Sequence, residues 1–190
     1  MKKVAVFFGG KSCEREISVL TGVFVLNLLD REKFTPIPVY QHSDGKFYTS
    51  PTMFDVDTFK QIQTEDFEQV VFLGDELFKI IKKGKKQTAL KRIEKIDAGL
   101  NCCHGGLGEG GGVSALTALF DIPFASPPLT PSGVFLDKAF TKLVLKGLNI
   151  PTLDYVRVVE QDYLRRGKFL LRNISNIICS EMCASSILNA

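Results

Sequence analysis

The chain has 190 residues, of which 45% are hydrophobic and 24% are charged. This composition supports a buried core and excludes disordered and collagen-like proteins. Basic residues exceed acidic ones by 24 − 21 = 3. That excess is too small to indicate nucleic acid or an anionic membrane as the partner, so we expect a small-molecule ligand.

No apolar run reaches the ~20 residues of a membrane-spanning helix. Five cysteines, an odd number, are typical of free thiols in a reducing compartment, which predicts a cytoplasmic protein.

The amino-terminal segment has the pattern of a strand, a helix and a second strand. Val4–Phe8 is a short apolar run that stops at two glycines, which predicts a strand rather than a signal peptide. A proline-free stretch from Glu14 to Leu29 then predicts a largely buried helix. Its apolar positions with helical spacing are Ile17, Leu20, Phe24 and Leu28. Phe34–Tyr40 predicts a second strand, whose two prolines favour an edge or irregular position.

Residues 41–95 predict an elaborated insertion of short strands. Asp44 and Gly45 form a turn signal, and Val70–Leu73 and Leu77–Ile81 have strand-like composition. The lysine-rich run over residues 82–95 is interpreted as a solvated hairpin tip and face. The alternative for this run is a patch that attracts anionic ligands.

The second half of the chain repeats the sequence of strand, glycine-rich loop and helix. Ile96–Cys103 predicts a central parallel strand, and Val113–Phe120 predicts the helix after the loop. The further predictions are a strand over Pro123–Ala125, a turn over Ser126–Pro131, a helix over Ser132–Leu148, a strand over Thr152–Val159 and a helix over Glu160–Ile174. This order predicts an α/β fold with a doubly wound parallel sheet, whose ligands bind at the carboxyl ends of the strands.

The first glycine loop, G-G-K-S-C-E-R-E over Gly9–Glu16, follows a strand and precedes a helix. It is not a Walker A loop, because Ala5 stands where that motif requires its first glycine. Glu14 lies at the carboxyl end of the strand, where it could receive a substrate ammonium group. The alternative is structural: Ser12 or Cys13 lies near the helix N-cap, and the acidic residues complement the helix dipole.

The second glycine loop, H-G-G-L-G-E-G-G over His104–Gly111, contains a formal G-x-G-x-x-G pattern. A dinucleotide site also needs an acidic residue about 20 positions further on, and Leu129–Pro131 supplies none. The glycines indicate close approach of the backbone to a ligand or unusual φ angles. His104 could donate a hydrogen bond to a carboxylate, or it could simply tether the loop.

A third candidate site is a pair of lysines on one helix face. Lys138 and Lys142 are four residues apart, which is the spacing of ordinary surface lysines and equally of a phosphate-binding pair. Cys179 and Cys183 are also four apart, but neither a histidine nor a second cysteine pair accompanies them. We therefore expect no metal site in this chain.

Four segments in this order resemble the amino-terminal part of D-alanine–D-alanine ligases, over about residues 3–172. They are V-A-V-F-F-G-G-K-S-C-E-R-E-I-S, N-C-C-H-G-G-L-G-E-G-G-G, S-G-V-F-L-D-K-A-F-T-K and N-I-P-T. The resemblance implies a Rossmann-like (pre-ATP-grasp) α/β substrate-binding domain over residues 1–130. It further implies the start of an ATP-grasp central domain over 131–174, followed by an aberrant tail over 175–190.

The same resemblance implies ATP-dependent formation of a D-alanine dipeptide for peptidoglycan synthesis, with Mg²⁺ stabilising the phosphates. Glu14 would be the catalytic residue that binds the ammonium group of the first D-alanine. Ile17, His104 and Gly105 would complete the substrate site, and Lys138 would contact the phosphates of ATP. The resemblance also suggests a homodimer.

This chain departs from the family pattern in three places. Gly110 replaces an acidic or amide residue, and Ser126-Pro127-Pro128 replaces a Gly-Ser turn. After Arg172 the sequence lacks the family's Lys-Pro strand and its magnesium ligands, so we predict a truncated or frameshifted product that does not ligate on its own. Two other functions stay open at this point: a non-catalytic module that binds D-amino acids or dimerises, and an ATP-grasp ligase for another amino or hydroxy acid.

Overall fold

The computed structural model describes residues 1–83, 87–155, 157 and 164. The chain divides into two compact units, Met1–Gly133 and Val134–Ala190. Three sequence predictions lie outside the described residues. They concern the helix over Glu160–Ile174, of which only residue 164 is described, the pair Cys179 and Cys183, and the tail from residue 175. Among the described helices, none is long and apolar enough to span a membrane.

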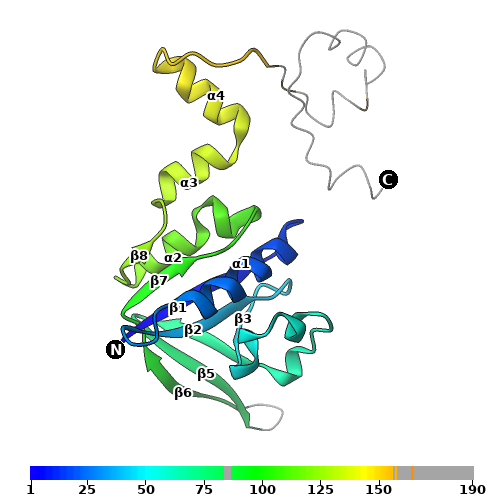
Figure 1. Cartoon of the computed structure of the whole chain (residues 1–190), viewed down its shortest axis with the longest axis vertical. Coiled ribbons are helices and arrows are strands. Elements are labelled where there is room, and N and C mark those ends of the chain that lie inside the picture. The colour runs from blue at the N-terminus through cyan, green and yellow to red at the C-terminus, as the bar shows by residue number, and fades with distance from the viewer. Residues whose placement is uncertain (84–86, 156, 158–163, 165–190) are drawn as a thin grey trace. The chain divides into compact units, whose positions relative to one another are not determined.

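The first unit is built on a mixed sheet with the strand order β6-β5-β4-β3-β2-β1-β7-β8 (Figure 1). The strands are β1 (Lys2–Gly9), β2 (Phe34–Gln41), β3 (Phe47–Thr49), β4 (Glu68–Leu73), β5 (Glu76–Lys83), β6 (Gln87–Lys95), β7 (Ala98–Asn101) and β8 (Phe124–Ala125). The pairs β1–β2, β1–β7 and β7–β8 are parallel. The α/β class, the parallel core and the predicted strands in the first unit are therefore confirmed, although β7 begins two residues later and ends two residues earlier than predicted.

Strands β3 to β6 pair antiparallel, and this extends the sheet beyond the parallel core that the sequence predicts. Short turns explain the direction of β3 against β2 and of β5 against β4. The turn at Asp44 and Gly45 joins β2 to β3, and Gly74 lies in the turn between β4 and β5. A parallel pairing would need a crossover of a dozen or more residues, which these turns do not provide.

Strand β2 is an interior strand of the sheet, whereas its prolines favour an edge or irregular position. It pairs with β1 along its whole length, but it pairs with β3 only at Tyr40 and Gln41. Pro36 and Pro38 therefore lie where one side of β2 has no neighbouring strand, and the missing N–H donors cost little there.

Strand β1 separates two hydrophobic clusters, one on each face of the sheet. Val4, Val6 and Phe8 belong to the cluster beneath α1 (Arg15–Leu28). Ala5 and Phe7 belong to the cluster that contains residues of α2 (Val113–Leu119). Because successive side chains of a strand point to opposite faces, the all-apolar sequence of β1 is the sequence of a strand covered on both sides.

Helix α1 rests on the sheet with one face, while its apolar residues with helical spacing are exposed. Its buried residues are Ser18, Val19, Gly22, Val23 and Leu26. Ile17, Leu20, Phe24 and Leu28, which we call the α1 stripe, are 52%, 52%, 64% and 67% exposed. The prediction of a largely buried helix is wrong, because the face with the small residues allows the closest approach to the sheet. A β-carbon at Gly22 would lie 2.3 Å from Cγ of Phe8.

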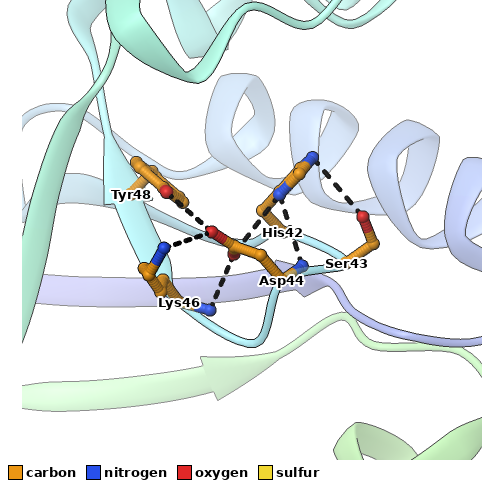
Figure 2. A network of polar contacts seen from close by, with 5 residues as sticks. All are labelled: His42, Ser43, Asp44, Lys46 and Tyr48. Atoms are coloured by element: carbon orange, nitrogen blue, oxygen red, sulfur yellow. Dashed lines mark hydrogen bonds and ion pairs between the residues drawn. The ribbon is translucent and has the colours of Figure 1, made fainter.

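The turn between β2 and β3 is held by a polar network around Asp44 (Figure 2). The Asp44 carboxylate accepts hydrogen bonds from the Lys46 amine at 2.8 Å and from the Tyr48 hydroxyl at 3.0 Å, and it lies 3.3 Å from Nδ1 of His42. Partial burial opposes ionisation of Asp44, but its hydrogen bonds, first of all with Lys46, outweigh this effect and hold its pKa well below the usual range. The network is therefore internally satisfied and stabilises the turn.

Tyr40 and Tyr48 provide a matched test of hydrogen bonding in the core. The hydroxyl of Tyr40 is buried and has no hydrogen-bond partner among the described residues, whereas that of Tyr48 donates to Asp44. We expect Tyr40→Phe to raise the free energy of unfolding by about 1 kcal/mol, because the cost of burying an unpaired hydroxyl disappears. Tyr48→Phe should lower it by about 1 kcal/mol. Urea unfolding followed by circular dichroism measures both; equal losses in the two variants would contradict the assignment.

The second unit begins within a helical segment that the sequence predicts as one helix. The structure has two helices, α3 (Leu129–Leu136) and α4 (Lys138–Gly147). They are separated at Asp137, whose carboxylate caps α4 by accepting hydrogen bonds from the backbone amides of Ala139 and Phe140 at 2.8 and 3.0 Å. Aspartate is favoured at an N-cap, and this local preference breaks the longer apolar pattern. Residues 152–155 do not form the predicted strand, and most of the rest of that prediction lies outside the described residues.

Candidate functional site

The two glycine loops lie at the same edge of the sheet. β1 and β7 are neighbouring parallel strands, so the loops that follow Gly9 and Asn101 both leave from their carboxyl ends. Gly9 and Gly10 have φ values of 86° and 108°, which side chains with a β-carbon rarely adopt. A β-carbon at Gly9 would also lie 2.5 Å from the carbonyl oxygen of Gln41. Glycine is therefore required where the chain leaves β1.

A buried serine of α1 joins the starts of both loops. The hydroxyl of Ser18 accepts a hydrogen bond from the amide of Gly9 at 2.7 Å and donates one to the carbonyl of Cys102 at 2.8 Å. The side chain is completely buried, so these bonds are shielded from water. Ser18 thus holds the ends of β1 and β7 together beneath the loops.

The loops also contact each other directly. The Ser12 hydroxyl donates to the carbonyl oxygen of His104 at 2.7 Å and accepts from the amide of Glu14 at 3.2 Å. Gly105 and Gly106 have φ values of 67° and 59°. A β-carbon on Gly106 would lie 3.1 Å from the carbonyl oxygen of Lys11. The second loop is therefore seated on the first, and its left-handed glycines allow this close approach.

Glu14 lies at the N-cap position of α1, but its side chain does not cap the helix. Within the described part of the chain, its carboxylate forms no ion pair or hydrogen bond. One carboxylate oxygen, Oε2, lies 2.8 Å from the position of a β-carbon on Gly105. The exposed Glu14 carboxylate is thus placed against the backbone that follows His104.

His104 is held by its backbone and by its ring. Its carbonyl accepts from Ser12, and its ring nitrogen Nε2 lies 3.0 Å from the hydroxyl oxygen of Thr21 on α1. The ring is half-buried. The tethering role that the sequence analysis left open is therefore part of the structure, and it leaves Nδ1 without a hydrogen bond among the described residues.

The thiols next to His104 are unsuited to nucleophilic chemistry. Burial raises the pKa of Cys102 to about 11 and that of Cys103 to about 12. Both side chains therefore stay protonated at neutral pH, and a thiol is a weak nucleophile in that form. Among the candidate groups at this edge, the carboxylate of Glu14 and the imidazole of His104 are the ones available to a polar ligand.

The two other predicted site residues are Ile17 and Lys138. Ile17 is exposed in the first turn of α1, three residues after Glu14. Lys138 is exposed at the first position of α4, in the second unit. Lys142, in contrast, donates to the carbonyl of Leu153 at 3.0 Å. Of the two lysines, Lys138 is the one without a hydrogen bond or ion pair among the described residues.

Sequence reasoning assigned no role to three residues that shape this edge. Ser18 and Thr21 are polar residues inside an apolar helix, and this anomaly is the signal that could have identified them. Asn101 ends β7, where its side chain accepts from the amide of Cys103 at 3.0 Å and donates to the carbonyl of Gly108 at 3.1 Å. Residues that shape a ligand site are expected at the carboxyl end of a parallel strand, and the polar Asn101 occupies such a position.

An open, mainly apolar cavity of about 560 Å³ lies beside α2. It is lined by α2, by β8 and by the start of α3, and its residues include Thr117, Ile122 and Phe124. None of the predicted substrate residues lines it. The described residues also contain no cluster of three or more histidine, cysteine or acidic side chains that could hold a metal ion.

Comparison with known proteins assigns this arrangement to a family. Residues 3–127 match the family model described as D-ala D-ala ligase N-terminus. The chain belongs to this family. It is 31% identical over 170 residues to a D-alanine–D-alanine ligase of Thermosipho melanesiensis, covering 87% of this chain and 46% of that protein. It is also 31% identical over 175 residues to the ligase of Clostridium novyi, covering 92% and 47%.

The fold agrees with solved structures of the same family. A crystal structure of the D-alanine–D-alanine ligase from Helicobacter pylori superposes with a TM-score of 0.71 at 24% identity, covering 95% of this chain and 53% of that one. The chain thus spans about half the length of these relatives. The residues that match the family model include both glycine loops.

Proposed function

We propose that this chain supplies the first-substrate half-site of a D-alanine–D-alanine ligase, an ATP-dependent enzyme of peptidoglycan synthesis. The observation that carries the proposal is the position of the Glu14 carboxylate against Gly105, the residue after His104. A carboxylate and an imidazole at one strand edge can together bind an amino acid zwitterion, with the carboxylate pairing with its ammonium group.

Glu14 would receive the ammonium group of the first D-alanine. Its carboxylate is exposed and free of ion pairs within the described residues, so binding the ammonium does not require an existing ion pair to break. A charge-assisted hydrogen bond of this kind contributes about 1.5–3 kcal/mol. It also fixes the orientation of the amino acid, which leaves the carboxylate of D-alanine to react.

The glycines of the second loop would form the wall next to this ammonium site. With no side chain at Gly105 and Gly106, the backbone can approach the ligand closely. Glu109 fixes the loop, because its carboxylate accepts a hydrogen bond from the amide of Gly105 at 2.5 Å. Ile17 would add an apolar contact from the first turn of α1.

Lys138 would contribute to binding the phosphates of ATP. It is an exposed lysine at the start of α4, and Asp137 already satisfies the amides of Ala139 and Phe140 there. The positive charge for a phosphate therefore comes from the side chain rather than from these amides.

Magnesium, when bound, would neutralise charge on the phosphates. The described residues contain no cluster suited to hold it, so we assign it no ligand in this part of the chain. We place the reaction in the cytoplasm. The thiols of Cys102 and Cys103 are free, and free thiols are typical of a reducing compartment.

Calorimetric titration of the 190-residue chain with D-alanine tests the half-site. We expect weak but saturable binding at millimolar concentrations, with L-alanine binding less tightly. Glu14→Gln should weaken D-alanine binding by about 10- to 100-fold, because it removes the charge that pairs with the ammonium group.

Glu32→Gln is the matched control for this titration. Glu32 is exposed in the turn before β2, at the opposite end of the sheet, so its replacement should leave D-alanine binding unchanged. Equal affinity of the wild-type chain and Glu14→Gln would refute the proposed role of Glu14. Absence of any heat in the wild-type chain would refute the half-site itself.

We further propose that Leu20, Phe24 and Leu28 of the α1 stripe form a homodimer interface. The stripe is apolar and exposed, and α1 has no charged residue after Glu16. A two-fold dimer places the same patch of both copies against each other, and an uncharged apolar patch is complementary to itself. Exposed apolar patches of this kind commonly mark protein interfaces.

Phe24→Asp should convert the dimer into a monomer. It places two like charges, one from each copy, in the centre of the stripe, where desolvation and repulsion oppose association. We expect the dissociation constant of the dimer to rise by more than 10-fold. Sedimentation equilibrium at micromolar concentrations measures this constant. Leu119→Asp on α2 is the control, because Leu119 is equally apolar and 79% exposed. A monomeric wild-type chain, or loss of the dimer in both variants, would contradict this interface.

A further inference from the structure

We infer that Thr21 sets the tautomer of His104, so that Nε2 carries the proton and Nδ1 is the ring nitrogen left for a substrate. The inference rests on the proposed function only for the identity of the ligand. The hydrogen-bond geometry that supports it lies within the ligand-free chain.

The hydroxyl of Thr21 has two close neighbours but only one proton. Its oxygen lies 3.0 Å from the carbonyl oxygen of Ile17, one turn earlier in α1, and 3.0 Å from Nε2 of His104. The carbonyl oxygen can only accept a hydrogen bond. If the hydroxyl donates to Ile17, its lone pairs can accept from Nε2–H of His104, and both short contacts are hydrogen bonds.

The opposite arrangement makes one of these contacts unfavourable. If Thr21 donated to Nε2, its oxygen and the carbonyl oxygen of Ile17 would face each other at 3.0 Å with lone pairs on both sides. The first arrangement is therefore preferred, and in neutral His104 it places the proton on Nε2.

The backbone of His104 is fixed independently, so the ring cannot easily find another partner. Ser12 on the first loop donates to the His104 carbonyl at 2.7 Å. Ser12 and Thr21 thus hold the two ends of one residue, and both belong to the segment that also carries Glu14. Nδ1, which has no hydrogen bond among the described residues, is the ring atom that can meet a ligand next to Glu14.

This tautomer defines what His104 can offer a zwitterion. In neutral His104, Nδ1 is a hydrogen-bond acceptor, which suits an ammonium group. Donation to a carboxylate from Nδ1 requires the imidazolium form, because Nε2–H is already engaged by Thr21. Thr21 is therefore a positioning residue that acts through His104.

Nitrogen-15 NMR of the imidazole rings tests the inference on the ligand-free 190-residue chain. The chain has two histidines, so a His42→Gln variant assigns the two sets of signals. At a pH where His104 is neutral, we expect its Nε2 to be protonated and to show a slowly exchanging proton. Thr21→Val keeps the shape of the side chain but removes the hydroxyl. It should abolish the slow exchange and move the shifts of the two ring nitrogens toward each other.

Thr21→Ser is the matched control, since it retains the hydroxyl and should restore the slowly exchanging Nε2–H signal. A wild-type spectrum with the proton on Nδ1, or an unchanged His104 signal in Thr21→Val, would overturn the inference.

Adding D-alanine then tests the ligand separately. A shift of Nδ1 larger than that of Nε2 supports its role as the substrate-facing atom, whereas a larger shift of Nε2 would overturn that role. A complete lack of response to D-alanine would contradict the proposed function, while the tautomer has already been decided without ligand.

Discussion

Gly22→Ala is expected to lower the free energy of unfolding by about 2 kcal/mol. A β-carbon at this position of α1 would lie 2.3 Å from Cγ and 2.5 Å from Cβ of Phe8. Phe8 is completely buried and packs against Tyr40 and Phe59, with ring centroids 5.6 Å away in both cases. It cannot move aside, so α1 must lift from the sheet. Overpacking of this kind costs about 1–3 kcal/mol or more and exceeds the ~1 kcal/mol gained in helix propensity.

The same substitution at a glycine with free space separates packing from propensity. Gly147 ends α4, and a β-carbon there would meet no atom within 4 Å. Gly147→Ala should therefore leave stability unchanged or raise it slightly. Urea unfolding followed by circular dichroism measures both variants. If Gly22→Ala were as stable as Gly147→Ala, α1 would not lie as close to Phe8 as described.

Gly105→Ala is expected to abolish D-alanine binding while the chain stays folded. The new β-carbon would lie 2.8 Å from Oε2 of Glu14 and 3.3 Å from Cβ of Ser12. The Glu14 carboxylate is the end of a flexible side chain, so it can turn away at little cost in stability. Its displacement from the ammonium position should weaken D-alanine binding by up to about 100-fold, because the charge-assisted hydrogen bond to the ammonium group, about 1.5–3 kcal/mol, is lost.

Gly45→Ala is the control for the backbone conformation. Gly45 also has a positive φ, of 84°, but a β-carbon there would meet no atom within 4 Å. Both variants should lose about 1 kcal/mol of stability for the left-handed backbone. Only Gly105→Ala should lose D-alanine binding in calorimetry. Normal binding by Gly105→Ala would show that Glu14 and Gly105 do not share a site.

Local sequence patterns predicted the parallel core and the position of both glycine loops at one edge of it. The apolar run of β1 is that of a strand buried on both faces, and each glycine loop follows a strand of the core. Because the carboxyl ends of parallel neighbours share one edge, Glu14 and His104 could be expected near each other. The structure brings their loops together through Ser12.

Features that depend on tertiary packing could not be predicted in the same way. The face of α1 that meets the sheet is decided by Gly22 and Ser18, which add little to an apolar pattern. The break between α3 and α4 depends on one cap, Asp137. Thr21 could not be assigned a role from sequence, because its importance comes from a ring that lies 83 positions away along the chain.

A crystal structure of the chain with D-alanine tests the central claim most directly. We predict that the ammonium nitrogen lies within hydrogen-bond distance, about 2.7–3.2 Å, of the Glu14 carboxylate, with the ligand against Gly105 and facing the ring of His104. D-alanine bound at another place on the chain, with no contact to Glu14 or His104, would contradict the claim that the two glycine loops form one amino acid site.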